Sequence, residues 1–330
     1  MKHLLHLGFA LALIGLFVGK CGPRFGWFPA PHELVMAEGD RAEVDETTVL
    51  YLEKFDIRHY PSGKIRQYVS SVKVIDQERH SLAAAEISVN HPLRVNGWWV
   101  YQYGYGPDQT DTLCTQLRCV KDCGLPFAAL GGALLLIGTF GLAVAGLRRA
   151  PADDGRQTTD DSRRTTADSR RTTSDGRSLV RPIVSYLLAS LVVCLPLFII
   201  GRAVLRPEPV PALQSWLMAP HVAAYTASYL ILLFAVFGIG RRFVPLGFFL
   251  MTTGLVLGAV WGKLAWSEWW QFDPKENWSF FTWLAFAAYF HFRGDSRAAR
   301  WLLRLGAVLI IVTLTWVNFS RVLSGLHSYA

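Results

Sequence analysis

The stretch LPFAALGGALLLIGTFGLAVAGL, residues 125–147, decides the kind of fold that this chain adopts. It has no charged residue along its whole length, and about 20 apolar residues in a helix are enough to cross the hydrocarbon core of a bilayer. Six further stretches have a comparable apolar character. They are residues 4–19, 182–201, 216–239, 243–262, 278–292 and 301–319.

The composition of the whole chain agrees with several membrane spans. Of its 330 residues, 52% are hydrophobic and 18% are charged, whereas a soluble domain carries about 25% charged residues. The net charge of +8 would favour a nucleic-acid partner in a soluble protein, but basic loops also mark the cytoplasmic side of membrane proteins. We therefore expect a polytopic α-helical membrane protein with about seven transmembrane helices and no nucleic-acid partner.

Basic segments indicate the orientation of these spans. If seven spans alternate, every strongly basic segment falls on one side, which should be cytoplasmic. These segments are Lys2, residues 148–181, Arg241 with Arg242, and residues 293–304. No small-x-small cleavage site follows the first span, so we expect a retained anchor there rather than a cleaved signal peptide.

Residues 20–124, on the other side, have the pattern of a folded domain. Alternating or β-branched segments are separated by the turn residues Pro61-Ser62-Gly63 and Asn96-Gly97. The predicted strands are residues 48–55, 67–75, 85–89 and 97–103. We expect a small extracytoplasmic antiparallel β-domain between the first two spans.

A repeat divides the chain into two halves. GRQTTDD, SRRTTAD and SRRTTSD follow one another within residues 155–178, but no position of the seven is apolar, so a coiled coil has no seam to bury. We expect residues 148–178 to be a disordered cytoplasmic linker between a first half, 1–147, and a second half, 179–330. Aspartates among the arginines argue against RNA binding.

The sequence WGKLAWSEWWQFDPKENWSFFTW, residues 261–283, holds six of the 12 tryptophans. Tryptophan prefers the membrane interface, so an aromatic belt is one interpretation. A belt does not explain why Trp266, Trp269 and Trp270 lie in a short segment ending at Asp273. Large flat side chains beside charges suit a flat apolar ligand with a polar edge, such as a porphyrin. We call residues 266–273 the Trp-rich loop.

Histidines occur on both sides of the predicted membrane. His221 and His327 fall on the side of the Trp-rich loop, and neutral imidazole is a common axial ligand of haem iron. His6 and His291 lie within spans near the opposite face, where an ionisable group is a functional candidate by default. Contact with lipid headgroups is the alternative for each, and His3 could take the place of His6.

At this point a resemblance to a known family becomes visible. The segment WSEWWQFDPKENWSFFTWLAFAAYFHFR, residues 266–293, resembles the tryptophan-rich WWD motif of haem-handling proteins in cytochrome c maturation. HVAAY, residues 221–225, and NFSRVLSGLHSYA, residues 318–330, extend the resemblance to the CcsA family.

The first half is similar to the CcsB/ResB family. The segments are FDIRHYPSGKIRQYVSSVKV (55–74), ISVNHPL (87–93) and LRCVKDCGLPFAALGG (117–132). The full chain therefore resembles a compact, fused CcsB/ResB–CcsA System II cytochrome c synthase.

This resemblance implies a haem lyase type of enzyme that exports haem b and attaches it covalently to the Cys-x-x-Cys-His motif of apocytochrome c. His221 and His327 would ligate haem iron on the outer side, and His291 with His6 on the inner side. The outer haem platform would comprise Trp266, Trp269, Trp270 and Asp273.

The family also implies partners and a place in the cell. Apocytochrome c, haem, membrane lipid and a thiol-reducing thioredoxin-like protein are the expected partners. The expected location is the bacterial inner membrane, with the β-domain, the Trp-rich loop and the C-terminus on the periplasmic side.

Some positions depart from the family pattern. Gly commonly stands where this chain has Ser267, Tyr where it has Trp269, and Trp where it has Phe272, and the family has more spans. Two other functions therefore compete with the synthase: a CcmC-like haem transporter or chaperone that passes haem to a separate ligase, and a structural assembly partner.

Three cysteines cluster before the second span. Cys114, Cys119 and Cys123 have the spacing C-x4-C-x3-C, which suits neither a zinc site nor a thioredoxin-like pair. Because bacterial external compartments are oxidising, we expect one structural disulfide, with Cys21 as a further candidate partner, and no thiol chemistry.

Overall fold

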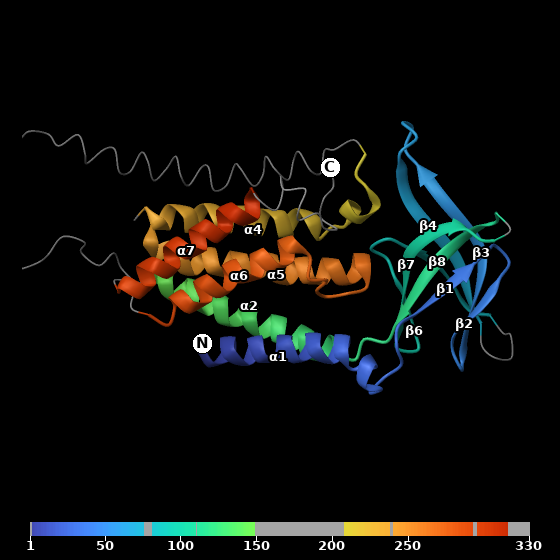
Figure 1. Cartoon of the computed structure of the whole chain (residues 1–330), viewed down its shortest axis with the longest axis horizontal. Coiled ribbons are helices and arrows are strands. Elements are labelled where there is room, and N and C mark those ends of the chain that lie inside the picture. The colour runs from blue at the N-terminus through green and yellow to red at the C-terminus, as the bar shows by residue number, and fades with distance from the viewer. Residues whose placement is uncertain are drawn as a thin grey trace, which may run out of the picture.

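A computed structural model describes residues 2–75, 81–109, 111–148, 208–237, 240–292 and 296–315. Within these residues the chain forms a bundle of long helices with a β-domain at one end (Figure 1). The predicted span at residues 182–201, almost all of the predicted linker at 148–178, and His327 lie outside the described residues.

The helical bundle agrees closely with the predicted spans. Its helices are α1 (Lys2–Cys21), α2 (Leu125–Arg148), α4 (Met218–Val236), α5 (Val244–Trp266), α6 (Pro274–Tyr289) and α7 (Arg297–Leu314). Among the described residues, four segments are long and apolar enough to cross a membrane: α1, α2, α4, and α5 together with the short helix η3 (Arg241–Phe243).

The remaining two helices are less clearly spans. With 16 residues, α6 is shorter than a typical transmembrane helix of about 20. The first turns of α7 carry Arg297, Arg300 and Arg304. A membrane protein is confirmed, but the total of about seven spans stays a prediction.

Glycines set the close contact between α1 and α2. A Cβ atom built on Gly15 or Gly131 would come closer than 3.0 Å to backbone atoms of the other helix. Small residues of this kind let two helices approach within a membrane, where lipid offers no hydrophobic driving force for their association. The first half of the chain therefore enters the bundle as an antiparallel helix pair.

The β-domain consists of two four-stranded antiparallel sheets. One has the order β1-β8-β7-β6 and the other β2-β3-β4-β5. The strands are β1 (His32–Met36), β2 (Arg41–Asp45), β3 (Thr48–His59), β4 (Ile65–Ile75), β5 (Ser81–Ser88), β6 (Leu93–Val95), β7 (Trp98–Pro107) and β8 (Leu113–Val120).

Alternation along the strands produces the core of this domain. The inward side chains of both sheets meet in one cluster that includes Leu50, Leu52, Ile87, Val100 and Leu117, each fully buried. Residues on one face of a strand recur at every second position, and this is why the four predicted strands coincide with parts of β3, β4, β5 and β7, to within one residue at their ends. The predicted antiparallel β-domain is confirmed.

The predicted disulfide is wrong for the described cysteines. Cys21, Cys114, Cys119 and Cys123 are all free. Cys114 and Cys119 both lie in β8, so the strand rise of about 3.3 Å per residue separates them by far more than a disulfide spans.

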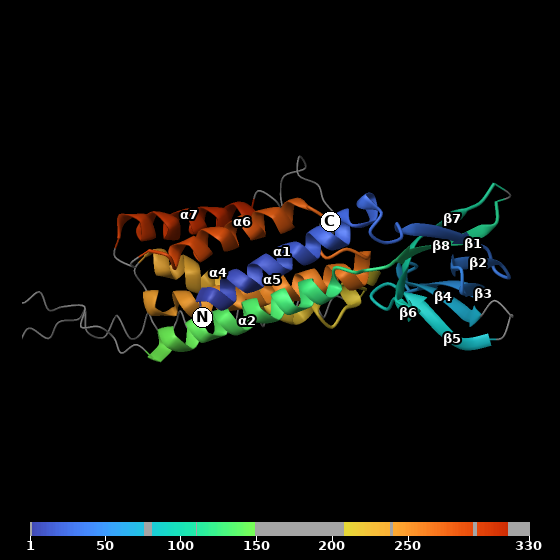
Figure 2. The same ribbon diagram turned by 90° about the horizontal axis from the view of Figure 1, so that it is seen from below.

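The two ends of the bundle differ. Figures 1 and 2 show that α1 ends, and α2 begins, beside the β-domain, whereas the start of α1 lies at the opposite end. The Trp-rich loop connects α5 to α6, and it also lies at the end of the bundle that faces the β-domain (Figure 1). We call this the outer end of the bundle and the opposite one the inner end, after the predicted orientation, which stays a prediction.

Candidate functional site

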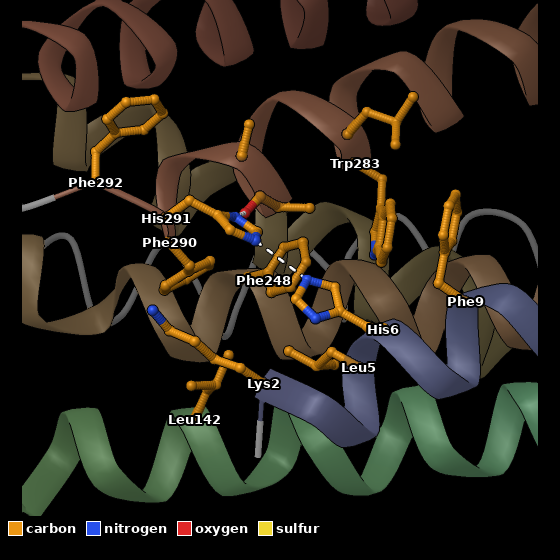
Figure 3. A pocket seen from close by; sticks show the side chains of 13 residues that line it. Lys2, Leu5, His6, Phe9, Leu142, Phe248, Trp283, Phe290, His291 and Phe292 are labelled. Atoms are coloured by element: carbon orange, nitrogen blue, oxygen red, sulfur yellow. Dashed lines mark hydrogen bonds between the residues drawn. The ribbon is translucent and has the colours of Figure 1, made fainter.

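A pocket opens at the inner end of the bundle, between α1 and the end of α6 (Figure 3). Its volume is about 380 Å³, within the range of about 300–1,000 Å³ common for small-molecule sites. The lining is almost wholly apolar, and its polar side chains are His6, His291 and Lys2. The apolar part comprises Leu5, Phe9, Leu142, Phe248, Trp283, Leu284, Ala287, Ala288, Phe290 and Phe292.

Two of the predicted ligands meet in this pocket. Nε2 of His6 lies 3.2 Å from Nε2 of His291, and the ring centroids are 5.4 Å apart. The two residues are 285 positions apart in sequence, so the fold, and not local spacing, brings them together. His3 does not line the pocket.

A backbone contact orients the imidazole of His291. Its Nδ1 lies 3.1 Å from the carbonyl oxygen of Ala287, one helical turn earlier. With the hydrogen on Nδ1, Nε2 carries the lone pair and faces the pocket. Metal-ligating histidines usually donate their second ring nitrogen in this way, because the hydrogen bond fixes the tautomer and the ring orientation.

Aromatic rings form one wall of the pocket. Trp283 stacks on Phe9 with centroids 5.6 Å apart and an interplanar angle of 19°. Phe248 packs on the same indole at 5.4 Å, and Nε1 of Trp283 donates to Thr252 Oγ1 at 2.9 Å. This wall is therefore fixed by contacts from three helices and offers flat apolar surface beside the two histidines.

Lys2 is a pocket residue that the sequence analysis missed. It precedes His6 by four positions, and residues i and i+4 lie on the same face of a helix. Its side chain lines the pocket beside Phe290 (Figure 3). The pocket thus combines an apolar chamber, two imidazoles and one cationic group.

At the outer end, His221 lies on the first turn of α4 against α5. Its Nδ1 is 2.8 Å from the carbonyl oxygen of Gly254, and this contact helps to orient the imidazole ring. Its ring packs on Tyr225 at 5.1 Å and on Trp261 at 5.8 Å. Gly258 makes room for it, since a Cβ there would lie 2.6 Å from His221 Cε1.

The tryptophans of the Trp-rich loop do not share one set of partners. The ring of Trp266 packs on Trp261 at 5.6 Å and so adjoins the His221 cluster. Trp269 donates its Nε1 hydrogen to Asp122 at 2.8 Å, whereas Trp270 donates to Asn277 at 3.3 Å. Two of the three tryptophans of the predicted platform are therefore hydrogen-bonded to side chains outside the loop.

Asp273 has a clear structural task. It is the N-cap of α6, and its Oδ1 accepts from the backbone nitrogen of Lys275 at 2.9 Å. In return, Glu276 accepts from the backbone nitrogen of Asp273 at 3.2 Å, which completes a capping box. The sequence DPKE contains this signal, with Pro at the first helical position, but it was interpreted as part of a ligand platform.

The described residues contain no group of three or more His, Cys, Asp or Glu side chains that could hold a bare metal ion. An axial ligand pair for haem iron needs only two imidazoles, and His6 with His291 provides such a pair. The roles of His6, His291, His221, His327 and the Trp-rich loop in haem binding stay predictions.

Two known protein families match different parts of the chain. Residues 2–117 match the ResB-like family, and residues 236–327 match the family described as Cytochrome C assembly protein. The resemblance to a fused CcsB/ResB–CcsA chain is confirmed. We refer to the described residues up to 148 as the ResB-like half and to those from 208 onward as the CcsA-like half.

Individual relatives resemble the CcsA-like half. A cytochrome c biogenesis protein CcsA from Prochlorococcus marinus is 46% identical over 92 residues, which are 27% of this chain and 29% of that protein. The protein of the same name from Gloeobacter violaceus is 45% identical over 92 residues, 27% of each chain. The chain thus spans less than a third of the length of these relatives.

Proposed function

We propose that this protein works in cytochrome c maturation, carries haem b across the bacterial inner membrane and attaches it to apocytochrome c. Haem is a substrate in this scheme. The family matches of both halves support the proposal. The single observation that carries it is that His6 and His291 lie within hydrogen-bonding distance of each other, 3.2 Å between their Nε2 atoms, in the lining of one apolar pocket.

The inner pocket has the chemistry that haem requires. Two neutral imidazoles can take the axial positions of the iron, and the rings of Phe9, Phe248 and Trp283 provide apolar contact for the porphyrin. Lys2 offers a positive charge to a propionate at the edge of the pocket.

On the outer side, His221 and His327 would hold the iron while Trp266, Trp269 and Trp270 contact the porphyrin. Thioether formation adds a cysteine S–H across a haem vinyl group: sulfur bonds to the carbon next to the ring, and the proton goes to the terminal carbon. The addition involves no net oxidation. The chain contributes mainly by holding the vinyl edge beside the incoming thiols, and the incoming histidine of apocytochrome c displaces one protein ligand.

The test uses the full chain purified in detergent. We expect a haem b spectrum of two imidazole ligands, with haem content falling at least several-fold in the variants His6→Ala and His291→Ala and recovering with added imidazole. The matched control is His3→Ala, which lies on the same helix outside the pocket and should keep its haem. Unchanged spectra and haem content in the His6→Ala, His291→Ala double variant would refute the inner site.

A cellular experiment separates attachment from transport. The full chain is expressed with an apocytochrome c in bacteria that lack every other maturation system. Covalent holocytochrome is the expected product. Haem-loaded protein without holocytochrome would instead favour a haem transporter that passes haem to a separate ligase.

A further inference from the structure

The structure holds a buried ion pair at the outer end of the bundle. Lys263 Nζ lies 2.7 Å from Asp122 Oδ2, and the side chains are 5% and 3% exposed. Asp122 belongs to the ResB-like half and Lys263 to the CcsA-like half. Burial of two charges removes their hydration, so such a pair contributes little to stability on its own and calls for another explanation.

The carboxylate of Asp122 has further partners that point to the Trp-rich loop. Its Oδ2 also accepts from Trp269 Nε1 at 2.8 Å, and its Oδ1 accepts from the backbone nitrogen of Gly124 at 3.1 Å. Lys263 in turn donates to the carbonyl oxygen of Ser267 at 3.0 Å. One carboxylate from the ResB-like half thereby holds the loop both directly and through Lys263.

The loop backbone needs such support. Ser267 and Phe272 both adopt positive φ angles, 69° and 60°, a conformation that costs non-glycine residues energy and persists only where the surroundings enforce it. Ser267 ends α5 as its left-handed C-cap. Its carbonyl is the one that Lys263 contacts, so the ion pair acts at the point where the chain turns into the loop.

A second contact between the halves is more open to solvent. Glu268 pairs with Lys20 at 2.8 Å and with Arg118 at 3.5 Å, and these side chains are 22–38% exposed. Solvent screens pairs of this kind, and their contribution is usually small. Glu268 is therefore a natural comparison for Asp122.

We infer that Asp122 is a positioning residue that sets the Trp-rich loop in its haem-binding arrangement, by holding the indole of Trp269 and the cation of Lys263. The inference rests on the proposed outer haem site. It explains what the ResB-like half adds to a loop that lies wholly in the CcsA-like half. It also assigns Trp269 a hydrogen-bonding task in addition to ring contact.

The experiment separates the hydrogen bond to Trp269 from the burial of charge. Asp122→Asn with Lys263→Met removes both charges but keeps an acceptor for the indole. Asp122→Leu with Lys263→Met removes both charges and the acceptor. Haem is titrated into each full-length protein in a His6→Ala background, so that the absorption spectrum reports the outer site.

We expect the haem dissociation constant of the Asp122→Asn, Lys263→Met protein (Asn/Met) to lie within about two-fold of that of the parent. For the Asp122→Leu, Lys263→Met protein (Leu/Met) it should rise at least five-fold, with an altered absorption spectrum. Glu268→Gln should match the parent. Trp269→Phe, which keeps a ring and changes no charge, should weaken binding as the Leu/Met protein does. If either double variant fails to fold, unchanged haem binding by Trp269→Phe would by itself overturn the inference.

Two results would count against the inference in different ways. Equal haem affinity in the parent, the Leu/Met protein and Trp269→Phe would overturn the positioning role of Asp122 while leaving the outer site in place. Absence of any haem binding by the parent in the His6→Ala background would instead contradict the proposed outer site itself.

Discussion

At the residue scale, substitutions of Asp273 test whether its side chain caps α6 or contacts haem. Asn is as good an N-cap as Asp, whereas Ala lacks the acceptor and costs about 1 kcal/mol. We expect Asp273→Ala to lower the thermal unfolding midpoint of the protein in detergent, and Asp273→Asn to leave both that midpoint and the haem content near those of the parent. Equal loss of haem in both variants, with unchanged unfolding, would show that the negative charge serves haem instead.

The cysteines of the β-domain give a second test at this scale. Burial raises the pKa of the Cys119 thiol to about 12, and the thiolate is the form that reacts. At pH 8 only about one Cys119 in ten thousand is then ionised, so we expect it to resist alkylation in the folded protein. Burial raises the pKa of Cys114 as well.

Peptide mapping after iodoacetamide treatment checks this prediction. Cys119 should stay unmodified at pH 8 and become fully modified after denaturation, which also removes the burial. Modification of Cys119 in the native protein as fast as in the denatured one would be inconsistent with its place in the core cluster.

At the scale of elements, the contact between α1 and α2 determines where His6 lies. Gly131 faces α1 so closely that a side chain there must push the helices apart. We expect Gly131→Leu to displace α1 and thereby separate His6 from His291. Haem content at the inner site should fall several-fold, although neither histidine is changed.

The control for this variant is Gly132→Leu on the same helix. A Cβ at Gly132 meets only Val256 side-chain atoms at 3.6 Å or more, so α1 need not move. Normal haem content in Gly131→Leu would contradict the dependence of the pocket on this contact.

At the scale of the whole molecule, the inner pocket is shared between the two halves. His6 comes from α1 and His291 from the end of α6, so neither half alone provides both imidazoles. In a His221→Ala background, which removes the proposed outer site, we expect residues 1–178 and 179–330, expressed as two chains in the same cells, to recover the spectrum of the full-length variant. Each chain alone should lack it.

Absorption spectra of the purified complex check this prediction. His6→Ala in the first chain is the control, since it keeps the assembly but removes one imidazole. A full spectrum from residues 179–330 alone would mean that the inner ligands come from the CcsA-like half only.

Sequence alone determined the membrane character of the chain, the positions of the long helices and the presence of a β-domain. These features follow from local patterns. A long apolar run indicates a membrane span, and alternation of apolar and polar residues indicates a half-buried strand. The Trp-rich loop and the candidate histidines were found for the same reason, because residue type and local spacing are visible in a sequence.

Only the tertiary structure decided which of these residues meet. His6 and His291 are adjacent because glycines bring α1 against α2 and the bundle then places α6 beside α1, and no local pattern encodes that contact. The partners of Asp122 could not be predicted from the sequence either. Asp122 precedes one span and Lys263 lies at the end of another, and no sequence pattern links the two residues. Contacts between residues far apart in sequence depend on how whole elements pack, and packing is a property of the folded chain.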